Sequence, residues 1–290
     1  MTSRHVDIDP DGDTLIILPR ITAEGDDKNE PSQVTFKTSM KHLTLASIRA
    51  KKKFDPMFDP DAFEIVLRIV HAQLHKLPKE LSLATMTQVA IIADDLQCSD
   101  PIAHFAQQWG SNNDFWSASN TWIDLSRKIF ICSVFQLKDK FSWLTQAAII
   151  HSLKKVSSYG IPVPQQILHA IEEKRTILMK EQLKYLFTVE KELQDETLCW
   201  ECRAQNFGFL KYNLLLHQLP ASESSELWAN ITCQVLKEKM QKFKYATRTG
   251  CQYKSGLKHP SFKKQITEAL KVSNAGLDPA LFLNTAAAAK

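Results

Sequence analysis

Two short strand patterns open the chain, and every pattern after them is helical. Thr14-Leu-Ile-Ile-Leu18 is a short aliphatic run closed by Pro19, as a buried strand is, and Val34-Thr-Phe-Lys-Thr38 alternates apolar and polar residues. Two strands make only a small sheet, which helices must cover. The sequence therefore predicts an α+β fold that is mostly α, with a small sheet capped by helices and an all-helical C-terminal region.

The helical patterns are interrupted by one polar stretch. Asp59-Pro60 and Ser82 are typical helix starts, and apolar residues recur at three and four positions after each of them. Residues 110–121 are the most turn-prone part of the middle of the chain. We therefore expect a flexible N-terminus over 1–10, a first domain over 11–109, a linker over 110–121, a helical region over 122–272 and a flexible tail over 273–290.

Charge is unevenly distributed along the 290 residues, although the formal net charge is only +4. Residues 1–31 hold eight acidic and three basic side chains, whereas residues 233–272 hold ten Lys or Arg against Glu238 and Glu268. The basic stretch is typical of a solvated helix face. As an alternative function, it predicts a basic nucleic-acid or chromatin-binding protein, although no nucleic-acid-binding motif accompanies it.

The sequence contains none of the common catalytic motifs. There is no glycine-rich phosphate loop, no Gly-x-Ser-x-Gly elbow and no His-Glu-x-x-His helix, so we expect no enzyme activity. No run approaches the about 20 apolar residues that span a bilayer, and the acidic start resembles neither a secretory signal nor a transit peptide. We expect an intracellular protein of the cytoplasm or nucleus that is neither secreted nor bound to a membrane.

The clearest candidate for a bound ion is Cys199-Trp-Glu-Cys202, because two thiolates separated by two residues can bind one tetrahedral zinc ion. Cys251 and His259 are the candidates for the remaining ligands. The alternative is that Cys199 and Cys202 are small buried apolar residues at a helix start. Without zinc, we expect no cofactor.

Four segments of the first hundred residues resemble the BTB/POZ domain, in particular that of fungal BTB proteins with a long helical C-terminal half. The segments are Asp11 to Leu18, Phe36 to Ser47, Asp59 to His71 and Leu83 to Cys98. They cover about a third of the chain. Only sixteen positions separate Ser47 from Phe63, fewer than in the family, so the domain is shortened there by natural trimming or by missing coding sequence.

The resemblance implies a non-enzymatic protein–protein interaction module. BTB domains self-associate or offer a groove to a partner, often a cullin-type ubiquitin-ligase scaffold or a transcription factor, so a homodimer or a protein partner is expected. The residues that would form this fold are Asp13, Leu15, Ile17, Phe36, His42, Leu43, Leu45, Ser47, Phe63, Leu67 and Val70. The fungal relatives also look similar in having a Cys-x-x-Cys and a late cysteine-rich turn.

Overall fold

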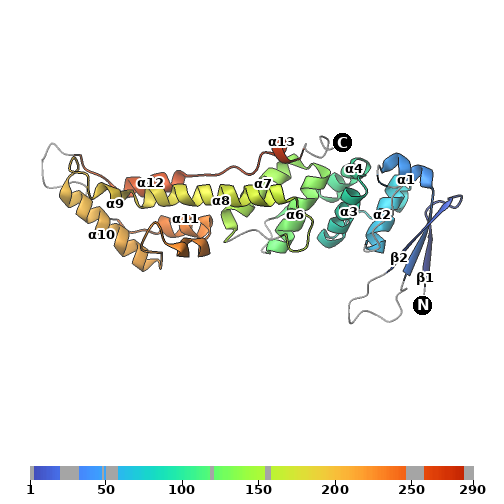
Figure 1. The fold of residues 1–290 in the computed structure, drawn as a ribbon, viewed down its shortest axis with the longest axis horizontal. Helices are drawn as coiled ribbons and strands as arrows, with labels where there is room; N and C mark the ends of the chain where they lie inside the picture. The colour runs from blue at the N-terminus through green and yellow to red at the C-terminus, as the bar shows by residue number, and fades with distance from the viewer. Residues whose placement is uncertain are drawn as a thin grey trace. The chain divides into compact units, whose positions relative to one another are not determined.

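The structure is a computed structural model that describes residues 3–19, 33–47, 49, 58–117, 121–153, 158–245 and 258–283 (Figure 1). The chain divides into two compact units. The first unit comprises residues 1–144, 158–164 and 278–290, and the second comprises residues 145–157 and 165–277. The fold is α+β and mostly α, as predicted, with a small mixed sheet near the N-terminus.

The sheet belongs to the first unit and has three strands, β1 (Ser3–Asp7), β2 (Thr14–Pro19) and β3 (Gln33–Thr38). Strand β3 lies in the middle, parallel to β1 and antiparallel to β2. In the turn between β1 and β2, the Gly12 N–H donates to the carbonyl of Asp9. A Cβ at Gly12 would lie 2.4 Å from the carbonyl oxygen of Thr38, so this close approach requires glycine.

One face of the sheet packs against helices of the first unit. Phe36 of β3 lies edge-on to Phe63, with ring centroids 5.6 Å apart, and both side chains are fully buried. Asp59 accepts a hydrogen bond from the N–H of Ala62, and Ser82 accepts one from Thr85, so both predicted helix starts are confirmed. The helices of this unit are α1 (Met40–Ala46), α2 (Pro60–Val70), η1 (Leu74–Lys76), α3 (Leu83–Asp95), α4 (Ser99–Trp109), α5 (Asn113–Trp116), α6 (Trp122–Phe135) and α13 (Pro279–Phe282).

The second unit is helical, and α8 packs against α11 and α12. An aromatic cluster joins α10 to α12, because the rings of Phe209 and Phe243 both stack on Phe262, at centroid distances of 6.4 and 6.2 Å. Helix α7 (Lys138–His151) begins in the first unit and ends in the second. The other helices are α8 (Gln165–Leu186), α9 (Thr188–Glu192), α10 (Trp200–Leu216), η2 (Glu226–Asn230), α11 (Cys233–Gln241) and α12 (Phe262–Lys271).

The predicted domain boundaries differ from the structure. Residues 3–7 form β1 instead of a flexible terminus, because pairing with β3 satisfies the backbone of a segment whose one buried side chain is Val6. The expected linker over 110–121 contains α5, and Trp116 is buried there with its indole N–H donating to the carbonyl of Gly110 at 2.6 Å. The first unit extends to Leu144, because α6 packs against α3 and α4.

The predicted flexible tail over 273–290 also contains ordered elements. In the second unit, Leu277 is buried and its N–H donates to the hydroxyl oxygen of Thr145 at 2.9 Å. In the first unit, α13 follows, and Leu283 after it is buried. Thr145 and Leu277 lie more than a hundred residues apart in the sequence, so local composition did not indicate this contact.

Three of the predicted core residues point outward. An edge strand covered on one face buries every second side chain, and in β2 these are Ile16 and Leu18. The seven-residue helix α1 buries Leu43 alone. The structure therefore buries Phe36, Leu43, Phe63 and Leu67, leaves Val70 half-buried at the end of α2, and exposes Leu15, Ile17 and Leu45 by 62%, 57% and 76%.

A pair of substitutions in α1 tests this assignment of its two faces. Leu43→Asp should lower the free energy of unfolding by about 3 kcal/mol or more, because it buries an unpaired charge. Leu45→Asp, two residues away on the exposed face, should change it by no more than about 0.5 kcal/mol. Urea unfolding followed by circular dichroism measures both values, and equal effects would contradict the burial described here.

Candidate functional sites

The face of the sheet opposite Ile16 and Leu18 carries two exposed apolar side chains, those of Leu15 and Ile17. Leu15 of β2 lies opposite Lys37 of β3, and Ile17 lies opposite Thr35. On the other side of β3, His5 pairs with Thr35, and Asp7 pairs with Lys37. The apolar side chains therefore lie along the β2 edge, beside a polar surface formed by β3 and β1.

Three residues of the BTB-like segments, Asp13, Ser47 and His71, position helix α1. The carboxylate of Asp13 accepts a hydrogen bond from the Met40 N–H at 2.8 Å, and this bond, together with one from Thr14, holds the pKa of Asp13 below its ordinary value. The Ser47 hydroxyl donates to the carbonyl of Leu96 at the end of α3. Asp13 thus anchors the start of α1, and Ser47 anchors the chain that leaves it.

The third anchor of α1 is His71, and His42 lies beside it. The Ser39 N–H donates to Nε2 of His71 at 3.1 Å, while Nδ1 lies 2.8 Å from the carbonyl oxygen of Leu67. Since the amide can only donate and the carbonyl can only accept, His71 is neutral with its proton on Nδ1. The half-exposed His42 ring lies 5.1 Å from the His71 ring, and its Nδ1 is 3.9 Å from a carboxylate oxygen of Asp9.

Three of the four predicted metal ligands come together in the second unit. The Sγ atoms of Cys199 and Cys202 and a ring nitrogen of His259 all lie within 4.8 Å of one another. Cys202 Sγ is 3.5 Å from Nδ1 of His259. Cys199 is buried, Cys202 is half-buried and His259 is exposed, so the cluster lies at the surface of the unit. Cys251 falls outside the described residues, and its part in the site stays a prediction.

The local sequence explains how the two cysteines are placed. The carboxylate of Asp195 accepts hydrogen bonds from the N–H and the hydroxyl of Thr197, and these bonds lower the pKa of Asp195 and close a turn before Leu198. Cys199 is the N-cap residue of α10, and Cys202 lies in its first turn. Both sulfurs are therefore at the positive end of a seventeen-residue helix dipole, which favours thiolates.

A second set of contacts brings His259 to these cysteines. Leu198 and Lys258 form a parallel β-bridge, in which the Cys199 N–H donates to the Lys258 carbonyl at 3.0 Å. The buried side-chain amide of Asn206 donates to the carbonyl of Pro260, also at 3.0 Å. His259 is thus held by backbone anchors on both sides. The sequence did not indicate the roles of Lys258 and Asn206, because each contact spans more than fifty residues.

The other described cysteines have a different environment. Burial raises the pKa of Cys98 to about 12 and that of Cys233 to about 11, and it also raises the pKa of Cys132. These thiols stay protonated at neutral pH and behave as small apolar side chains. The burial of Cys199 at the start of α10 agrees with the alternative prediction of a small buried residue there, whereas Cys202 is only half-buried.

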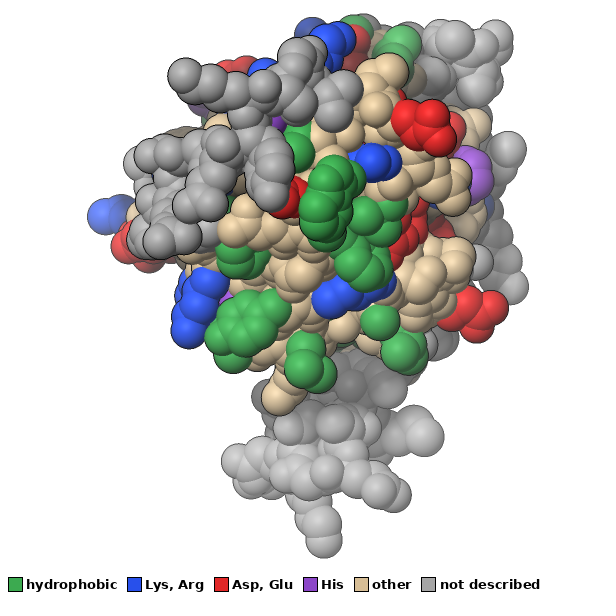
Figure 2. Space-filling model, turned by 90° about the vertical axis from the view of Figure 1, so that its left-hand side faces the viewer, with side chains coloured by type: hydrophobic (Ala, Val, Ile, Leu, Met, Phe, Trp, Pro, Cys, Tyr) green, Lys and Arg blue, Asp and Glu red, His purple; other side chains and the backbone are tan. Residues whose placement is uncertain are grey.

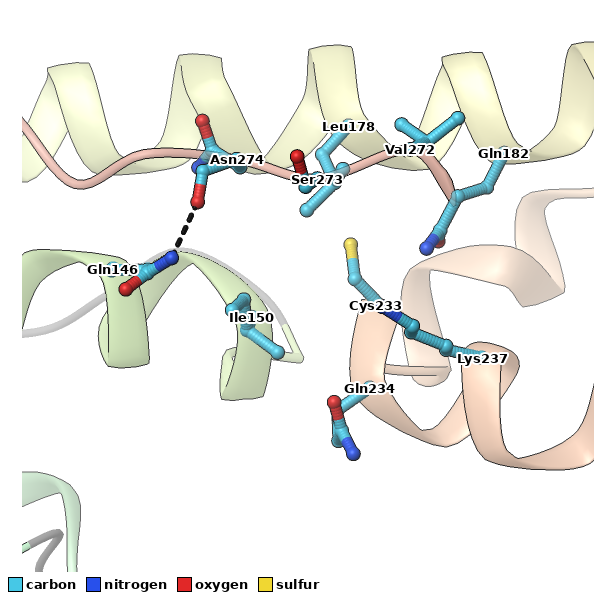
Figure 3. Close-up of a pocket in the computed structure, with 10 residues that line it drawn as sticks. All are labelled: Gln146, Ile150, Leu178, Gln182, Cys233, Gln234, Lys237, Val272, Ser273 and Asn274. Atoms are coloured by element: carbon cyan, nitrogen blue, oxygen red, sulfur yellow. Dashed lines mark hydrogen bonds between the residues drawn. The ribbon is translucent and has the colours of Figure 1, made fainter. Parts of the chain in front are cut away.

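A cavity of about 140 Å³ lies within the second unit, between the end of α7, helices α8 and α11 and residues 272–274 (Figure 3). On one side, Nε2 of Gln146 donates to the carbonyl oxygen of Asn274 at 2.7 Å. Oε1 of the buried Gln182 and Nδ2 of Asn274 have no hydrogen-bond partner among the described residues. Both atoms belong to side chains that line the cavity, which has room for a water molecule.

Helix α10 exposes large apolar side chains on its outward face. Trp200, Tyr212 and Leu215 are 66%, 49% and 81% exposed, and a Cβ added at Gly208 would meet nothing within 4 Å. Figure 2 shows the side of the molecule on which α9 and α10 lie, with hydrophobic side chains gathered among polar ones. This apolar face begins at Trp200, which lies between Cys199 and Cys202 in the sequence.

Acid should weaken the fold through His71. Burial lowers the folded pKa of His71 below its ordinary value of 6.5, so the unfolded chain binds the proton first and the free energy of unfolding should fall as the pH drops from about 8 through 6.5. His71→Gln should flatten this dependence, and His75→Gln, at an exposed position, should retain it. Urea unfolding across this pH range measures the slopes, and identical slopes in wild type and His71→Gln would contradict the assignment.

The chain has no significant match among the protein-family models, the curated proteins or the solved structures with which it was compared. None of the described helices is long and apolar enough to cross a membrane. The BTB resemblance therefore rests on four segments of this sequence, and any function must be argued from the chain's own geometry.

Proposed function

We propose that this chain is a non-catalytic protein-interaction module whose first unit binds a second copy of itself. The observation that carries the proposal is the exposure of Leu15 and Ile17 on the open face of an edge strand. The BTB resemblance of the same segment supports it, since BTB domains commonly self-associate. On this view the sheet supplies the contact surface, and the helices behind it keep the sheet rigid.

Strand β2 has the properties of a pairing edge. It pairs with β3 on one side, and none of its six residues, Thr14–Pro19, is charged. Natural edge strands usually carry lysines, inward charges or bulges that prevent pairing with another chain. Among the six residues of β2, only Pro19, at the end of the strand, opposes such pairing.

A second copy suits this edge because the contact would be self-complementary. Two antiparallel β2 strands related by a two-fold axis would bring Leu15 and Ile17 of both copies to one face. Burying each such side chain contributes about 1.5–3 kcal/mol, and no like charges on β2 would oppose one another. A cullin-type scaffold or a transcription factor, as the resemblance implies, would be a further partner of the dimer.

The test is the mass of the full chain by sedimentation over a range of concentrations. Wild type should form a dimer, and Ile17→Asp should weaken dimerisation by at least about tenfold, because each symmetric contact gains two charges. Leu74→Asp, at another exposed apolar position in the first unit, should leave the dimer unchanged.

Two outcomes would contradict self-association through β2. One is a wild-type monomer at every concentration, and the other is an Ile17→Asp dimer as tight as that of wild type. The nucleic-acid alternative is tested by titrating the protein with a random-sequence DNA duplex. Tight binding that falls steeply with added salt would favour this alternative, with residues 233–272 as the binding segment.

A further inference from the structure

We infer that Cys199, Cys202 and His259 bind one zinc ion, which closes the second unit between the start of α10 and the chain that leads into α12. The site shares no residue with the proposed dimer contact, since all three ligands belong to the second unit and β2 belongs to the first. Its role is structural, because it joins two segments that lie 57 residues apart in the sequence.

The distances fit a tetrahedral ion. Zinc bonds of about 2.3 Å to sulfur and about 2.0–2.1 Å to nitrogen give sulfur–nitrogen edges of about 3.5 Å and a sulfur–sulfur edge of about 3.8 Å. The Cys202 sulfur lies 3.5 Å from Nδ1 of His259, and no pair in the cluster exceeds 4.8 Å. Small side-chain rotations are therefore enough to bring all three ligands onto one ion.

The backbone holds these ligands in place without the ion. The Leu198–Lys258 bridge lies next to both Cys199 and His259, and Asn206 holds the carbonyl of Pro260. The Ser261 hydroxyl then accepts from the N–H of Lys264 and starts α12. A site organised in this way loses little ordering entropy on binding metal, and an ion across so long a loop stabilises the folded unit.

The ligand types indicate which metal would bind. Two thiolates and an imidazole favour zinc over calcium or magnesium, which prefer oxygen ligands. The three side chains leave one corner of the tetrahedron for a fourth ligand. The N-terminal end of α10 further favours the negative charge that the thiolates carry.

The experiment measures zinc in the full chain, purified under reducing conditions and dialysed against zinc, by inductively coupled plasma mass spectrometry. Wild type should retain about one zinc ion per chain, whereas Cys199→Ser and His259→Asn should retain at least about tenfold less at the same free zinc. Cys233→Ser and His169→Asn are matched controls in the same unit and should retain the wild-type content.

Cobalt substitution of wild type keeps the test valid if a variant fails to fold. Cobalt bound by two thiolates should give a sulfur-to-metal charge-transfer band and tetrahedral d–d bands, which added zinc abolishes. A strong chelator should also lower the melting temperature of zinc-loaded wild type and leave that of Cys199→Ser unchanged. Zinc-free wild type, cobalt spectra without the thiolate band, or a Cys199–Cys202 disulfide in the reduced preparation would each overturn the inference.

Discussion

The second unit is closed where the chain before α10 meets the chain before α12. Leu198 and Lys258 pair there through the backbone, and the loop that they close is about sixty residues long. Because loop closure is entropically costly, the bridge alone would be a weak closure, and the packing of α12 on α8 supports it. The cluster of Cys199, Cys202 and His259 lies beside this bridge, so an ion bound there would strengthen the closure.

The first unit depends on a different constraint, the alternation of side chains along a sheet that helices cover on one face. The buried side chains of β3 fix which face of β2 must be apolar for the core, and Ile16 and Leu18 fill those positions. The core within the described residues therefore does not require apolar side chains at Leu15 and Ile17. The proposed contact with a second copy would account for them, and the Asp13, Ser47 and His71 anchors keep α1 in place beside α2.

Local chemistry in the sequence was enough to predict some of these features. Asp59 and Ser82 begin helices because their side chains cap backbone N–H groups a few residues away, and Cys199 and Cys202 are neighbours on one helical turn. The orientation of β2 was not predictable, because the run Leu-Ile-Ile-Leu is apolar on both faces and shows no alternation.

Contacts between distant segments account for the other differences. Strand β1 has one buried side chain and forms through its pairing with β3. In the polar stretch after α4, the buried Trp116 packs against Gly110 and donates a hydrogen bond to its carbonyl. In the cluster of Cys199, Cys202 and His259, the histidine was a candidate through its residue type and its spacing from Cys251. Its placement depends on Lys258 and Asn206, whose partners lie more than fifty residues away and leave no local pattern.

Native mass spectrometry of the zinc-loaded full chain tests both proposals directly, because one spectrum reports the number of chains and the bound metal. We expect a mass of two chains with one zinc ion in each. A single chain without metal would contradict both the self-association through β2 and the closure of the second unit by zinc.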